Sequence, residues 1–182
     1  MSRVGKKPIV LPEGVEAEIK PDQAVIKGPK GTLTLKLHPL VKLIKEDKTL
    51  KVEVVHPEVK KERSLWGLFG SLLKNMVEGV TKGFEEKLEM SGIGFKAELK
   101  GQKLILSIGF SHTVDFAIPE GIEASVDKEI ITIKGIDKIL VGEIAARLRA
   151  LKKTEPYKGK GIKYVGEIIR RKAGKAAVKT AA

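Results

Sequence analysis

The chain has 182 residues, of which 42% are hydrophobic, and a formal net charge of +12 at pH 7. This content suffices for one large or two small domains, and the charge predicts an anionic partner such as nucleic acid, a membrane surface or an acidic protein. The absence of cysteine excludes disulfides and thiolate metal sites and fits a reducing cytosol. The sequence shows no signal peptide and no run of roughly 18 apolar residues, so a soluble, intracellular protein is expected.

The first part of the chain is predicted to form strands followed by one helix. Apolar segments separated by Pro, Gly and Asp indicate strands. They are Val15–Lys20, Ala24–Lys27, Thr32–Leu37, Val41–Lys45 and Leu50–Val55. A helix is expected over about 58–80, with an apolar stripe spaced mostly three or four residues apart. The stripe comprises Leu65, Leu68, Phe69, Leu72, Leu73, Met76 and Val80.

A short glycine motif lies between two of these strands. Residues 28–31 read Gly-Pro-Lys-Gly and match the GxxG loop with which KH domains hold nucleic-acid backbone. That loop joins two helices, whereas here both flanking segments favour strands. A tight hairpin turn is therefore the preferred interpretation.

The second part of the chain predicts a similar order of elements. Its strands are Lys87–Ser91, Phe95–Leu99, Leu104–Ile108, Thr113–Ile118, Ile122–Val126 and Ile130–Lys134. A helix over about 137–152 follows, with Asp137 as its candidate N-cap and an apolar stripe that faces the sheet. The stripe comprises Leu140, Ile144, Leu148 and Leu151.

The chain also repeats itself, with two different offsets. Residues 11–33 and 118–140 are identical at nine of 23 positions, an offset of 107. Residues 49–73 and 129–152 both predict a strand, a turn and a helix, an offset of about 80. The second match pairs whole elements and is preferred for the architecture, while the first is interpreted as one hairpin motif used twice. Both favour an α+β fold of two similar domains, each a mostly antiparallel sheet covered by one main helix, with a basic C-terminal extension. The predicted boundaries are 1–82, 83–152 and 153–182.

No catalytic or metal site is predicted. His38, His56 and His112 lie far apart beside turn signals, and none has a His or carboxylate at metal-ligand spacing. Residues 92–94 (Gly-Ile-Gly) open a dinucleotide-binding pattern, but Ala97 fills the place of the third glycine and no helix follows. We therefore expect no enzyme activity and no cofactor, with an enzyme whose site the sequence does not reveal as the alternative.

The basic charge is concentrated after the second predicted helix. Residues 152–175 contain nine Lys or Arg and two Glu, and no further strand or helix period is visible. Lysine and arginine neutralise phosphates, glycine lets a backbone approach closely, and tyrosine stacks on unpaired bases. This composition predicts a nucleic-acid interface followed by a disordered tail. A solubilising tail and a general DNA- or RNA-binding protein are the alternatives, and membrane-surface binding would need an apolar helix face that residues 152–182 lack.

Several segments in order give the chain a family resemblance. The most specific is the run Pro156-Tyr157-Lys158-Gly159-Lys160-Gly161-Ile162-Lys163-Tyr164. The others lie at residues 2–9, 64–68, 92–97, 108–112, 135–138 and 141–145. Together they resemble the bacterial large-subunit ribosomal protein six family along essentially the whole chain. One small departure is Thr154-Glu155, where Pro-Glu would be expected.

The resemblance implies a structural protein of the cytoplasmic large ribosomal subunit. Members of the family bind large-subunit (23S-type) ribosomal RNA near the base of the acidic stalk, the sarcin–ricin loop and the translation-factor site. Neighbouring ribosomal proteins at the stalk base would be further partners. The motif carries over Tyr157, Lys158, Gly159, Lys160 and Gly161 as RNA contacts. Charge and placement add Lys153, Lys163, Tyr164, Arg170, Arg171, Lys172 and Lys175, and also Arg3, Lys6 and Lys7 near the N-terminus.

Overall fold

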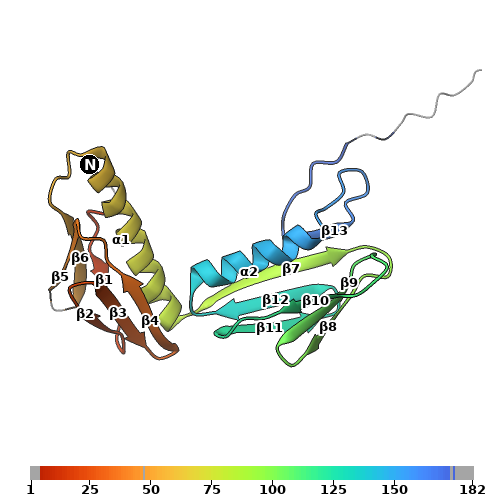
Figure 1. The fold of residues 1–182 in the computed structure, drawn as a ribbon, viewed down its shortest axis with the longest axis horizontal. Helices are drawn as coiled ribbons and strands as arrows, with labels where there is room; N and C mark the ends of the chain where they lie inside the picture. Colours follow the sequence, from red (N-terminus) through yellow and green to blue (C-terminus); the bar gives the residue numbers. More distant parts are fainter. Residues whose placement is uncertain (1–4, 47, 173, 175–182) are drawn as a thin grey trace, which may run out of the picture. The chain divides into compact units, whose positions relative to one another are not determined.

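A computed structural model describes residues 5–46, 48–172 and 174 (Figure 1). The chain divides into two compact units. The first ends at Phe84 and also includes Gly135–Lys138, and the second is built from the remainder of the chain. Each unit contains one long helix and antiparallel strands, which confirms the predicted α+β class with two similar domains.

The first unit places its strands in two three-stranded antiparallel sheets. One sheet has the order β2-β3-β4 and the other the order β1-β6-β5. The elements are β1 (Ile9–Val10), β2 (Glu16–Ile19), β3 (Gln23–Gly28), β4 (Gly31–Lys36), β5 (Val41–Glu46), β6 (Thr49–Val54) and α1 (Lys60–Thr81). Gly28 pairs with Gly31 across the turn between β3 and β4, so the hairpin interpretation of the GxxG motif is confirmed. The sequence did not predict β1, because two residues are too few to show a period.

Helix α1 covers both sheets of this unit. It contacts β3 and β4 of one sheet and β5 and β6 of the other. Phe69, Leu73 and Val80 of the predicted stripe are buried, but Leu68 is 51% exposed, contrary to the prediction. The helix also buries Val77, one residue after Met76. A helix that packs against two sheets needs an apolar face wider than a single stripe of residues spaced three or four apart.

The described residues of the second unit form seven strands and one helix. The sheet orders are β10-β9-β8 and β11-β12-β7-β13. The elements are β7 (Phe84–Ser91), β8 (Lys96–Lys100), β9 (Lys103–Ser107), β10 (Val114–Ala117), β11 (Ile122–Asp127), β12 (Ile130–Gly135), α2 (Lys138–Leu151) and β13 (Gly161–Tyr164). Helix α2 buries Val141, Ile144, Ala145 and Leu148, while Leu140 and Leu151 of the predicted stripe are half-buried.

The two units share one order of strands, which supports the repeat with the offset of about 80. In each, a three-stranded meander is followed by a hairpin and then the helix, and the strand before the meander pairs with the second strand of the hairpin. Thus β1-β6-β5 corresponds to β7-β12-β11, at offsets close to 80. The offset of 107 instead superimposes the hairpin β2–β3 on β11–β12, which occupy different places. It therefore reflects a reused hairpin motif.

Strand β13 corrects the expectation that regular structure ends at Leu151. It pairs antiparallel with β7, with Gly161 opposite Ser91 and Tyr164 opposite Leu88. Four residues are too few to show a period of two in the sequence. The strand is stabilised by its pairing with β7 rather than by an alternating pattern of its own. The predicted disordered tail lies mostly outside the described residues.

Candidate nucleic-acid interface

The predicted contact motif lies on an ordered loop between α2 and β13. The Ile162 N–H donates to the Lys152 carbonyl at 2.9 Å, and the Glu155 N–H donates to the Lys160 carbonyl at 2.8 Å. A third bond, 3.0 Å from the Gly159 N–H to the Glu155 carbonyl, closes the tip. The loop is therefore tied across its base and its tip, which limits the entropy that it loses when a ligand binds.

The two glycines of the motif shape this loop. Gly161 is buried, with φ 142°, and a Cβ there would lie 2.6 Å from the Thr154 Cα. Gly159 is also buried, with φ 74°. Both have backbone conformations that favour glycine, and Gly161 also has no room for a side chain. The structure thus gives these predicted contact residues a role in loop shape.

Five of the predicted cations are exposed near this loop. They are Lys153, Lys158, Arg170, Arg171 and Lys172. Within the described part of the chain, the side chains of these five form no ion pair, so their charges are available to an anionic ligand. Tyr157, at the tip, is 53% exposed. The predicted Lys160 is half-buried, and Lys175 and Arg3 lie outside the described residues. The exposed Lys6 and Lys7 belong to the first unit.

Two predicted contact residues already have partners in the protein. Lys163 Nζ lies 3.1 Å from the Glu89 carboxylate, in a half-buried ion pair. The half-buried Tyr164 ring lies 5.8 Å from the Arg149 guanidinium carbon, a cation–π contact. Both residues therefore help to attach β13 to the unit.

Sequence reasoning missed the group that fixes the chain after β13. The Glu167 carboxylate accepts two hydrogen bonds from the Arg149 guanidinium, of which the one from Nε measures 3.0 Å. It accepts a third hydrogen bond, of 3.1 Å, from the Tyr164 N–H. The hydrogen bond from Arg149, followed by the one from the Tyr164 backbone, holds the pKa of Glu167 below its ordinary value. The only sequence signal was an acidic residue within a basic segment.

A backbone hydrogen bond returns the following segment to the loop. The Lys172 N–H donates to the Pro156 carbonyl at 2.9 Å. This bond brings the cations at residues 170–172 beside the tip of the loop, which carries Tyr157 and Lys158. Basic residues far apart in sequence thus form a single surface, which we call the basic loop surface: residues 153–160 and 170–172.

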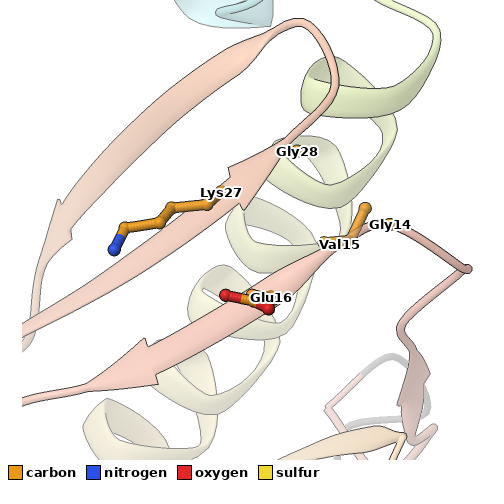
Figure 2. Close-up of a pocket in the computed structure, with 5 residues that line it drawn as sticks. All are labelled: Gly14, Val15, Glu16, Lys27 and Gly28. Carbon is orange, nitrogen blue, oxygen red and sulfur yellow. The ribbon is translucent and has the colours of Figure 1, made fainter.

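The first unit has a shallow hollow beside β2, of about 330 Å³ (Figure 2). It is lined by Gly14, Val15, Glu16, Lys27 and Gly28. The Lys27 ammonium nitrogen lies 2.5 Å from a carboxylate oxygen of Glu18. The charge of Lys27 is therefore already paired and is not available to a ligand in the hollow. The described residues contain no group of acidic or histidine side chains placed to hold a metal ion. No helix among them is long and apolar enough to cross a membrane.

Comparison with known proteins identifies the family. The model of the family described as Ribosomal protein L6 matches residues 11–83 and again 91–165. The chain belongs to the ribosomal protein L6 family. The two matched segments begin 80 residues apart, the offset by which the two units correspond.

Similar proteins match over nearly their full length. The large ribosomal subunit protein uL6 of Clostridioides difficile is 54% identical, with 98% of this chain and all of that protein covered. Those of Syntrophomonas wolfei and a Synechococcus strain are 53% and 51% identical over 97% of this chain, covering 98% and 97% of their own lengths. The predicted family is therefore confirmed.

Proposed function

We propose that the chain binds large-subunit ribosomal RNA through the basic loop surface and stabilises RNA packing, without catalysing a reaction. The chain is a ribosomal protein of the large subunit, and its location is the cytoplasmic ribosome. The observation that carries the RNA-binding proposal is a set of five exposed cations around Tyr157, on and beside an ordered loop, that form no ion pair with any residue that the structure describes.

The mode of recognition follows from the residue types. Lysine and arginine contact phosphates without reading sequence, whereas Asn and Gln, which read base edges, are absent from residues 152–172. Recognition is therefore of RNA shape and backbone, with Tyr157 available to stack on a base or lie against a sugar. Residues 153–182 would act as the RNA-binding extension of the C-terminal domain.

The family resemblance suggests where in the subunit this happens. The RNA would be the 23S-type region near the stalk base and the sarcin–ricin loop. Translation factors and the ribosomal proteins of the stalk base would be neighbours.

The test compares two charge-matched variants of the full chain. The first replaces Lys158, Arg170, Arg171 and Lys172 by Gln. The control replaces four exposed lysines of the first unit that form no ion pair among the described residues, Lys20, Lys36, Lys42 and Lys61. Binding is measured to a folded 3′ fragment of large-subunit rRNA that includes the sarcin–ricin stem, and to an unrelated RNA of equal length, at several salt concentrations.

The expected result is selective binding by the unmodified chain and by the control. The loop variant should bind weakly, with the slope of log affinity against log salt reduced by about 3. Equal loss in both variants would show that total charge, not this surface, determines binding. Equal affinity of the unmodified chain for both RNAs would instead indicate a general nucleic-acid binder.

A further inference from the structure

A second exposed surface of the same unit combines two aromatic rings with a lysine. Phe110 is 46% exposed, and its ring stacks on that of His112, with centroids 6.0 Å apart and planes 14° from parallel. The Lys152 ammonium nitrogen lies 4.6 Å from the centre of the Phe110 ring. We call Phe110, His112 and Lys152 the aromatic platform.

The connection that carries both rings is packed against a neighbouring loop. Phe110 and His112 lie between β9 and β10, and Phe95 lies just before β8. A Cβ on Gly92 would lie 2.8 Å from the Phe95 ring, and one on Gly109 would lie 3.3 Å from it. Gly109 also has φ 77°, a conformation that favours glycine. The Phe95 ring thus fills the space between the two connections and supports the residue that precedes Phe110.

The fold itself does not require an aromatic residue at position 110. Ile108, two residues earlier, is fully buried and anchors the end of β9 in the core. Phe110 leaves almost half of its surface in water, which costs free energy for so large an apolar side chain. An exposed ring stacked on a second ring is the arrangement on which nucleobases stack in proteins that bind single-stranded RNA.

The lysine connects the platform to the basic loop surface. The Lys152 carbonyl accepts the Ile162 N–H at the base of the loop, while its ammonium group reaches the Phe110 ring. Lys152 therefore links the aromatic platform to the base of the loop that carries the basic loop surface. A cation over an exposed ring is held weakly, and a phosphate attracts it more strongly. Lys152 can thus leave the ring when RNA approaches and expose the ring face to a base.

We propose that Phe110 and His112 form a stacking site for one unpaired base of the bound ribosomal RNA, and that Lys152 binds a phosphate beside that base. This inference rests on the proposed function, because it takes the same RNA as its ligand. It adds recognition of an unstacked base to a surface that otherwise contacts backbone.

The experiment uses the full chain and the rRNA fragment defined above. Phe110→Leu keeps an apolar side chain but removes the aromatic face, whereas Phe110→Tyr keeps that face. Leu99→Ala is the control, because Leu99 is 40% exposed on β8, near the hairpin turn at the opposite end of the same sheet. Circular dichroism establishes that each variant is folded. Chemical probing of the RNA bases accompanies the affinity measurement.

We expect Phe110→Leu to bind about tenfold more weakly with an unchanged salt slope, since stacking does not release counterions. Phe110→Tyr and Leu99→Ala should bind like the unmodified chain. One base that the unmodified chain protects from the probe should become reactive with Phe110→Leu. Lys152→Gln should instead reduce the salt slope by about 0.7–0.9.

Two results would overturn the inference while leaving the proposed function intact. One is selective binding with equal affinity and equal base protection for Phe110→Leu and the unmodified chain, which would leave a protein partner as the occupant of the platform. The other is equal weakening by Leu99→Ala, which would assign the effect to the sheet. Failure of the unmodified chain to select the fragment would overturn both proposals.

Discussion

At the scale of single residues, Gly161 shows how one missing side chain determines the shape of the loop between α2 and β13. A Cβ there would lie 2.6 Å from the Thr154 Cα and 2.7 Å from the Lys153 carbonyl oxygen, atoms of the backbone that cannot rotate away. We predict that Gly161→Ala destabilises the second unit by about 2–3 kcal/mol, through overpacking and the strain at φ 142°. Urea unfolding followed by hydrogen exchange of the β13 amides measures this loss.

Gly142, within α2, provides the matched control for that substitution. A Cβ at Gly142 would meet no atom within 4 Å. Gly142→Ala should therefore stabilise the helix by up to about 1 kcal/mol through its higher helix propensity. A Gly161→Ala chain as stable as the unmodified one would mean that the loop can move aside, and that its close packing does not fix the contact residues.

Glu167 makes the attachment of β13 depend on pH. The hydrogen bonds from Arg149 and from the Tyr164 N–H lower its pKa in the folded chain, so its contribution to stability is present above the ordinary pKa of about 4.3. That contribution is lost as the pH falls through the lowered value. We predict that protection of the Tyr164 amide from exchange falls on acidification in the unmodified chain.

The Glu167→Gln variant is the control for this prediction. Its Tyr164 amide should be less protected at neutral pH, by about 1 kcal/mol at most, because the Arg149–Glu167 pair is partly exposed. Its protection should change little over the same acidic range, and a parallel acid loss in both chains would assign the effect to other carboxylates.

At the scale of elements, the periodicity of apolar residues predicted the two long helices but not the shortest strands. The predicted helices over 58–80 and 137–152 correspond to α1 (Lys60–Thr81) and α2 (Lys138–Leu151), because their apolar stripes span three turns or more. Strands β1 and β13 escaped prediction because each is stabilised by a partner distant in sequence, Leu50 opposite Ile9 and Leu88 opposite Tyr164.

The same distinction explains which parts of the candidate site could be predicted. Composition located the exposed cations and Tyr157, since charge that a core cannot hold must face solvent or a ligand. It could not separate them from Lys163 and Tyr164, whose partners Glu89 and Arg149 lie on other elements. The bond from the Lys172 N–H to Pro156, which brings residues 170–172 to the loop, is also tertiary. Position in the sequence therefore located the exposed cations, and long-range pairing decided which side chains of the candidate site already have partners in the protein.

At the scale of the whole molecule, the first unit has a hydrophobic core that is built from its own residues. One core cluster consists of residues from the first unit alone, including Leu73 at 0% exposure, with Trp66 packed against it. Trp66 is the only tryptophan of the chain, and its indole N–H donates to the Val52 carbonyl at 2.7 Å. Its fluorescence therefore reports on the first unit. Exchange of the β7 and β13 amides reports on the second unit, where Ile162 is fully buried.

These two probes allow a prediction about how the chain unfolds. Leu73→Ala should cost about 2–5 kcal/mol and lower the urea midpoint of Trp66 fluorescence, with little effect on β7 and β13 exchange. Ile162→Ala should cost a similar amount but affect only the exchange of β7 and β13. Ile168→Ala is the matched control, because Ile168 is 95% exposed and its truncation should change neither probe by more than about 0.5 kcal/mol. If Ile162→Ala moved the fluorescence midpoint as far as Leu73→Ala does, the two units would unfold as one cooperative body. The loop between α2 and β13 would then depend on the stability of the first core as well as on that of its own unit.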